Sequence, residues 1–334
     1  MPQSAAIFGP EGHNVTNWER SFFRDCDPLG FILFARNVDT PEQLRRLTAD
    51  LRDAVGRDAP ILIDQEGGRV QRMCAPYWRE YLPPLDQMAV AHDPLRAMYL
   101  RYLLIAAELR DVGIDANCAP MADVADQDTH PFLRNRCYGQ DAETVIAAAR
   151  AVADGLLAGA VLPVLKHIPG HGRARVDSHK DLPRVTATRA DLAAQDFAPF
   201  KALNDLPMGM TAHIVFEDVD PTAPATTSAK MMQVIREDIG FGGLIMTYDL
   251  SMEALQGDLT ARAAGAIAAG CDVVLHCNGD AAEMEQVAAA SGALTPIAQA
   301  RAAAALAARK SPTLIDIPAL EAEFNGLLGE GPHG

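Results

Sequence analysis

The chain has 334 residues, of which 49% are hydrophobic and 22% charged, as is usual for a globular protein with a sizeable buried core. Its net charge of −15 excludes a broad contact surface for nucleic acid or anionic membrane, because both need a basic face. The six cysteines form no C-x-x-C pair, no apolar run approaches the roughly 20 residues of a membrane span, and the amino terminus is unlike a signal peptide. These features predict a reduced, cytoplasmic protein.

Short apolar runs recur along the chain and alternate with segments of helical composition. This alternation predicts a (β/α)₈ barrel, and the absence of a composition break predicts one domain over residues 1–334. A doubly wound open sheet is the alternative, because periodicity alone does not count strands. The eight expected strands are Ala5–Phe8, Gly30–Phe34, Pro60–Ile63, Ile114–Ala119, Val161–Leu165, Met208–Ala212, Leu244–Thr247 and Asp272–His276.

Three of the intervening segments carry explicit helix signals. Thr40 to Gln43 reads as a capping box with proline at the first helical position. Asp141 is expected to cap an alanine-rich helix that ends at Gly155 or Gly159. The segment Met98–Val112 is apolar on all sides, which predicts a well-buried helix.

Polar residues gather directly after strands three to eight. The third strand runs into D-Q-E-G-G-R-V-Q-R (64–72), the fifth into K-H-I-P-G-H-G (166–172), and the last three into His213, Asp249 and His276. In a barrel these loops share the carboxyl-terminal face, where barrel enzymes hold their active sites. The pattern therefore predicts a site for a polar, hydroxyl-rich ligand on that face.

The spacing of His167, His171, Asp177 and His179 also allows a different interpretation, a metal hydrolase. The first strand carries no H-x-H and the chain has no H-E-x-x-H, both of which favour a site without metal. We therefore expect no metal and no other cofactor.

Three segments together resemble glycoside hydrolase family 3, and most closely its bacterial β-N-acetylglucosaminidase (NagZ) branch. They are I-D-Q-E-G-G-R-V-Q-R, K-H-I-P-G-H-G-R-A-R-V-D-S-H and T-Y-D-L-S-M, in this order, and the similarity extends from about Gly9 to about Gly279. The resemblance implies a metal-free barrel that removes terminal N-acetylglucosamine from cell-wall muropeptides in the cytoplasm by a retaining mechanism. Protein partners, and phosphorolysis in place of hydrolysis, stay open.

The resemblance also implies roles for individual residues. A histidine assisted by an aspartate two residues earlier would be the general acid and base, which here are His179 and Asp177. The residues that would hold the sugar hydroxyls are Asp64, Arg72, Arg136, Lys166 and His167.

The chain departs from the family pattern at the nucleophile. The family places an aspartate after a serine or threonine at the end of the seventh strand, but here Tyr248 follows Thr247. Asp249 is a possible substitute, although side chains alternate along a strand, so it should point away unless the strand exit is bulged. Attack by Tyr248 itself would need activation, because a phenol has a pKa of about 10 and an aspartate one of about 3.9.

The favoured interpretation is a sugar site with impaired turnover. In this interpretation the chain is a glycosidase, or a non-catalytic amino-sugar or muropeptide binder derived from one, whose Tyr248 is a natural or an introduced substitution. The sequence does not separate these origins.

Overall fold

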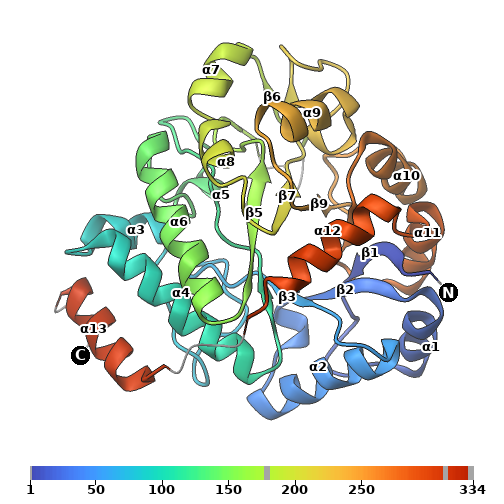
Figure 1. The fold of residues 1–334 in the computed structure, drawn as a ribbon, viewed down its shortest axis with the longest axis horizontal. Coiled ribbons are helices and arrows are strands. Elements are labelled where there is room, and N and C mark those ends of the chain that lie inside the picture. Colours follow the sequence, from blue (N-terminus) through green and yellow to red (C-terminus); the bar gives the residue numbers. More distant parts are fainter. Residues whose placement is uncertain (1, 177–180, 311–314, 330–334) are drawn as a thin grey trace.

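The computed structural model describes residues 2–176, 181–310 and 315–329, and a closed barrel of eight parallel strands lies at its centre (Figure 1). The closed barrel predicted from the sequence is confirmed, and the open-sheet alternative is wrong. Each expected run overlaps one barrel strand. In order around the barrel, the strands are β1 (Ser4–Phe8), β2 (Pro28–Leu33), β3 (Ile61–Ile63), β4 (Ala116–Asn117), β5 (Leu162–Ile168), β7 (Met208–Thr211), β9 (Leu244–Asp249) and β10 (Val273–His276).

Helices surround the barrel, and the short strands β6 (Arg184–Val185) and β8 (Val215–Phe216) pair with each other outside it (Figure 1). None of the described helices is long and apolar enough to cross a membrane. The helices are α1 (Asn17–Cys26), α2 (Pro41–Val55), α3 (Pro84–Val90), α4 (Pro94–Asp111), α5 (Pro131–Arg134), α6 (Ala142–Ala158), α7 (Arg189–Ala194), α8 (Ala198–Ala202), α9 (Ala229–Gln233), α10 (Leu259–Ala269), α11 (Ala281–Ser291), α12 (Pro296–Ala307) and α13 (Ile317–Leu328).

The helix signals in the sequence are largely confirmed. Asp141 caps α6 at its start, Gly159 is the C-cap at its end, and α4 is buried along most of its length. The Thr40 hydroxyl caps α2 by accepting the backbone N–H of Gln43. The expected capping box is only half formed, because the Gln43 side chain accepts the N–H of Asp39 instead of that of Thr40.

Two apolar layers hold the barrel together. The larger layer lies between the strands and the surrounding helices, and the smaller one fills the barrel interior. Interior side chains come from alternate strand positions, such as Leu244 and Met246 of β9, while Ile245 between them faces the outer layer. Helix α12 adds small side chains, including Ala298 and Ala302, to the interior layer. It therefore covers the barrel at the end where the strands begin.

The exit of β9 is irregular, and this irregularity lies beside the candidate nucleophile. Val273 of β10 pairs with Met246, but Leu275 pairs with Asp249, so three steps on β9 match two on β10. Such a register shift re-aims the side chains that follow it. The simple alternation of inward and outward positions therefore ends at Tyr248.

Candidate functional site

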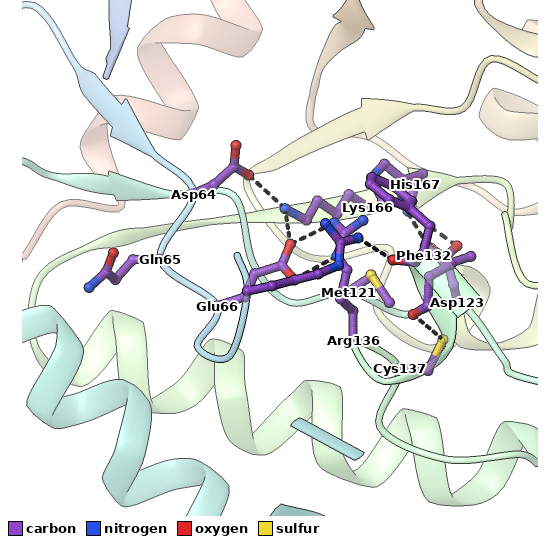
Figure 2. Close-up of polar contacts among 12 residues, drawn as sticks. Asp64, Gln65, Glu66, Met121, Asp123, Phe132, Arg136, Cys137, Lys166 and His167 are labelled. Atoms are coloured by element: carbon purple, nitrogen blue, oxygen red, sulfur yellow. Dashed lines mark hydrogen bonds and ion pairs between the residues drawn. The ribbon is translucent and has the colours of Figure 1, made fainter. Parts of the chain in front are cut away.

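A chain of buried charges lies where β3 and β5 end (Figure 2). The Lys166 ammonium bridges Oδ1 of Asp64 at 2.8 Å and Oε1 of Glu66 at 2.6 Å. The Arg136 guanidinium, from the segment after α5, donates two bonds to Glu66, at 2.7 and 2.9 Å. Arg72 reaches the other oxygen of Asp64 at 3.4 Å. Four of the five predicted sugar-binding residues therefore form one network.

The network keeps its carboxylates ionised. Burial alone would raise the pKa of Glu66, but Arg136 and Lys166 outweigh it and hold that pKa well below its ordinary value. The pKa of Asp64 is likewise lowered, because Lys166 and Arg72 outweigh its burial. Conversely, the carboxylates outweigh the burial of Lys166 and raise the pKa of its ammonium. Asp64, Glu66 and Lys166 are therefore all charged at neutral pH.

Glu66 is the residue that sequence reasoning missed. In the sequence it is only one residue of the D-Q-E-G-G-R motif, yet only 1% of its side chain is exposed and it joins Lys166 to Arg136. Its position two residues after Asp64, at the end of the same strand, is the sequence feature that could have identified it as a site residue. Beneath it, the buried Arg101 donates to the Glu66 carbonyl and to Oε1 of Gln87, at 2.8 Å for the latter. Gly67 takes a φ of +102° there, which glycine tolerates.

His167 is held in one orientation beside the network. Its Nδ1 lies 2.7 Å from Oδ2 of the buried Asp123, whose other oxygen accepts the backbone N–H of His171 at 2.7 Å. Burial lowers the pKa of His167 despite the Asp123 carboxylate, so the ring is neutral. With Nδ1 donating to Asp123, Nε2 is left as a buried acceptor without a hydrogen-bond partner in the structure.

A cavity of about 250 Å³ opens at this end of the barrel. Asp64, Arg72, Arg136 and Lys166 line it. Two phenylalanines form apolar walls: Phe34 lies 5.6 Å from the Arg72 guanidinium, and Phe132 lies 3.8 Å from that of Arg69 and 5.7 Å from that of Arg136. Apolar faces beside charged donors are suited to a ring that carries hydroxyls.

Tyr248 lines the same cavity, on the interior side of β9. Its ring lies 4.8 Å from the His167 ring and 5.4 Å from the His213 ring. Burial raises the pKa of the Tyr248 phenol to about 12, although Arg136 and Lys166 oppose the shift. The phenol is therefore protonated and neutral near pH 7.

Asp249 also lines the cavity, which is the case that the sequence allowed for an irregular strand exit. The register shift at the end of β9 is the physical reason. Its carboxylate accepts bonds from the hydroxyl of Ser251 at 2.6 Å, the N–H of Ser251 at 3.1 Å and the N–H of Cys277 at 3.2 Å. These bonds fix its orientation within the loop after β9.

The other strand-end histidines have local roles. His213 lies 2.7 Å from the Thr226 hydroxyl and 2.9 Å from the Asp249 carbonyl oxygen, which ties β7 to β9. His276 is buried beside Phe8, 3.5 Å from Glu283. Asp177 and His179, the predicted acid and base pair, lie outside the described residues. Among the described residues, no group of three or more histidine, cysteine, aspartate or glutamate side chains is placed to hold a metal ion.

A larger cavity, of about 1040 Å³, lies at the opposite end of the barrel between α6, α12 and the starts of β7 and β9. Its wall consists mainly of alanine, proline and leucine side chains. Two of its charged residues already have partners, because Asp205 binds Arg150 and Arg301 binds Asp272. The smaller cavity, which is lined by charged side chains, is therefore the candidate site for a polar ligand.

A closed (β/α)₈ barrel whose strand ends bring charged side chains together is the architecture of a barrel enzyme, and this chain has that architecture. The model of the glycosyl hydrolase family 3 N-terminal domain matches residues 16–308. The chain therefore belongs to glycosyl hydrolase family 3.

Known proteins of this family are similar over most of their length. A β-hexosaminidase of Bordetella avium is 36% identical over 287 residues, which cover 83% of this chain and 81% of that protein. The β-hexosaminidase of Methylococcus capsulatus is 38% identical over 280 residues, or 81% of this chain and 82% of that protein. The structure of NagZ from Neisseria gonorrhoeae in complex with N-trifluoroacetyl-D-glucosamine superposes with a TM-score of 0.86 at 30% identity, and covers 98% of this chain and 99% of that one.

Proposed function

We propose that the smaller cavity binds the terminal N-acetylglucosamine of β-linked glycosides, as in a β-N-acetylhexosaminidase. The observation that carries the proposal is the charged network of Asp64, Glu66, Lys166 and Arg136 beside the cavity. The names of the relatives, and the amino-sugar analogue bound to the gonococcal NagZ, support the substrate class.

Each charged residue that lines the cavity beside Glu66 offers a bond that a sugar hydroxyl can use. Asp64 can accept a hydroxyl hydrogen, and Arg72, Arg136 and Lys166 can donate to hydroxyl oxygens. His167 offers the acceptor Nε2 that has no partner in the structure. Because ion pairs fix these side chains in advance, little side-chain entropy is lost when the sugar binds.

The reaction follows the retaining double displacement of this family. In the first step a nucleophile bonds to the anomeric carbon while the leaving oxygen takes a proton, which the resemblance assigns to His179 assisted by Asp177. In the second step the histidine removes a proton from water, whose oxygen replaces the nucleophile on the sugar. The net change is one glycosidic bond cleaved and one water consumed.

We further propose that Tyr248 impairs the first step, so that the chain binds its sugar with little turnover. With a pKa of about 12, the buried phenol presents almost no phenolate at neutral pH. Asp249 lines the cavity, but its carboxylate is bound to Ser251 and Cys277. If turnover is absent altogether, the chain is a muropeptide-binding homologue without hydrolase activity. We propose that the protein acts in the recycling of cell-wall fragments in the cytoplasm.

The test is hydrolysis of a chromogenic β-N-acetylglucosaminide by the parent chain and by Tyr248→Asp. Turnover by the variant alone, with the parent at least a thousandfold slower, supports both proposals. Comparable turnover by the parent contradicts the impairment, and Asp249→Asn and Tyr248→Phe then identify the attacking group. If neither protein cleaves or binds the glycoside, the proposed substrate class is wrong.

A further inference from the structure

The backbone ladder of the barrel is irregular on both sides of position 248. On the β10 side, three steps on β9 match two on β10, and the Leu275 N–H is bound by the Thr247 hydroxyl at 2.9 Å. On the β7 side, the last paired residues are Met210 and Met246. Side chains therefore supply bonds that the backbone ladder lacks where β9 leaves the barrel.

His213, two residues after the end of β7, supplies such a bond on the β7 side. Its Nε2 lies 2.9 Å from the carbonyl oxygen of Asp249, and its Nδ1 lies 2.7 Å from the hydroxyl of Thr226. The N–H of Met252 also reaches the Asp249 carbonyl, at the longer distance of 3.3 Å. A carbonyl oxygen can only accept, so Nε2 carries the ring proton. Burial lowers the pKa of His213 to about 4, so the ring is neutral and Nδ1 accepts the Thr226 hydroxyl hydrogen.

The Thr226 hydroxyl is itself held in place. Because its single hydrogen points to Nδ1 of His213, the hydroxyl of Thr211 is the donor in the contact of 2.9 Å between the two threonines. The carbonyl oxygen of Ala212 lies 3.1 Å from the Thr226 hydroxyl and is the more distant acceptor. None of the three side chains, Thr211, His213 and Thr226, is exposed to water that could compete for these bonds. The imidazole therefore has one tautomer and one orientation.

The peptide that His213 holds also determines where two side chains point. Neighbouring residues on a strand ordinarily face opposite sides, yet Tyr248 and Asp249 both line the smaller cavity. They do so because the exit of β9 is irregular, and the Asp249 carbonyl that His213 binds belongs to that irregular exit. The His213 ring also lies 5.4 Å from the Tyr248 ring. Loss of the bond from Nε2 would allow β9 to return toward regular alternation.

We propose that His213 is a positioning residue for the sugar reaction: through the Asp249 carbonyl it holds the exit of β9, so that the side chain at position 248 faces the bound sugar. This inference rests on the proposed function, because it assumes that the smaller cavity is the sugar site. His213 is not among the residues that line that cavity. Its removal should therefore slow the chemical step and leave the binding of the sugar nearly unchanged.

The experiment replaces His213 in two ways, in whichever of the parent chain and Tyr248→Asp turns over faster. Glutamine carries an N–H₂ group near the place of Nε2 and can still donate to the Asp249 carbonyl, whereas asparagine reaches only to the place of Nδ1. His213→Asn should lower kcat for the chromogenic glycoside by about tenfold or more, with KM nearly unchanged, and His213→Gln should restore most of the rate. Urea unfolding of both variants shows whether a lower rate merely follows a lower stability.

The outcomes separate this inference from the proposed function. An unchanged kcat in His213→Asn, a change in KM alone, or a glutamine variant as slow as the asparagine variant overturns the inference. If neither the parent chain nor Tyr248→Asp turns over, the proposed hydrolysis fails, and amide hydrogen exchange in the parent background decides the inference. The N–H groups of Ser251 and Cys277, which the Asp249 carboxylate binds, should exchange severalfold faster in His213→Asn than in His213→Gln. Equal exchange would overturn it.

Thr226→Val provides a second variant should His213→Asn not fold. Valine has nearly the shape of threonine but lacks the hydroxyl that binds Nδ1, so the ring loses the bond that orients it. A fall in kcat at nearly unchanged KM is again expected, or faster exchange at Ser251 and Cys277 where no turnover is seen. Neither change in Thr226→Val would overturn the inference.

Discussion

Buried carboxylates lie at both ends of the barrel, and their partners differ. At the starts of β4 and β10, Asp115 accepts the N–H of Ile61 at 2.7 Å and Asp272 accepts that of Ile245 at 2.8 Å, each from the neighbouring strand. Each of these aspartates also binds two arginines: Arg52 and Arg309 for Asp115, and Arg236 and Arg301 for Asp272.

At the other end, Asp64 and Glu66 are held by three cationic side chains, Arg72, Arg136 and Lys166, all of which line the smaller cavity. The carboxylates at the strand starts therefore join strands to each other, whereas those at the strand ends hold the cationic side chains that line the smaller cavity. We propose that the first set serves stability and the second set ligand recognition. The following predictions test this division.

Asp115→Ala should have the largest effect on stability. It removes a strand-to-strand bond and the buried partner that Arg52 and Arg309 share, and it leaves them only the exposed Asp58, which should lower the free energy of unfolding by about 3 kcal/mol. The affinity of the folded protein for N-acetylglucosamine should not change. Urea unfolding and calorimetric titration measure the two quantities. A weakened affinity at unchanged stability would contradict the division.

Glu66→Gln should affect both quantities. The amide keeps the shape of the side chain but loses the charge that holds Arg136 and Lys166, so unfolding should become easier by about 1.5–3 kcal/mol. Affinity for N-acetylglucosamine should fall by about tenfold, since a loss of 1.4 kcal/mol is tenfold in binding. The same two measurements apply, with Asp115→Ala as the matched comparison. Unchanged affinity would mean that the network does not orient the donors.

Glu108 on α4 shows the effect of burying a carboxylate with fewer partners. Its Oε1 accepts the N–H of Arg79 at 3.2 Å and its Oε2 has no partner in the structure. Burial raises its pKa from 4.5 to about 7, although Arg79 opposes the shift. The folded state therefore binds more protons than the unfolded state between these pH values. The stabilising contribution is present below about pH 4.5 and is lost as the pH rises through 7.

Glu108→Gln should remove this pH dependence and stabilise the protein by roughly 1–3 kcal/mol at pH 8 compared with the parent chain. Below about pH 4.5 the two proteins should be equally stable. Unfolding curves at pH 4.5, 6 and 8 test the prediction. A variant that is less stable than the parent at pH 8 would contradict it, because the ionised Glu108 carboxylate would then gain more free energy from a partner than it loses through burial.

Glu323→Gln should have the smallest effect. Glu323 on α13 binds Arg96 on α4 at 2.7 and 2.9 Å, but both side chains are about 40% exposed. Exposed ion pairs are screened by solvent and contribute little. Neither the unfolding midpoint nor the sugar affinity should change measurably. A clear loss of stability would mean that this pair, and not apolar contact, holds α13 against α4.

The sequence predicted the barrel because its strands are apolar runs of nearly regular spacing and its helices begin with recognisable caps. The clustering of Asp64, Arg72, Arg136 and Lys166 followed from one topological rule, that parallel strand ends share a face. The central position of Glu66 could not be predicted, because it depends on how the Gly67 turn lies over Arg101. The inward placement of Asp249 depends on a register shift between β9 and β10, which no local pattern reveals.

The charged surroundings of Tyr248 bear on how such a protein changes over time. Tyrosine and aspartate codons differ only in their first base, so a single nucleotide exchange connects the two residues. If Tyr248→Asp turns over, the rest of the site, including the ion pairs of Glu66 and the His167–Asp123 contact, needs no further change for catalysis. A lineage could then lose and regain hydrolysis through position 248 alone. Selection for ligand binding would preserve the other residues that hydrolysis needs.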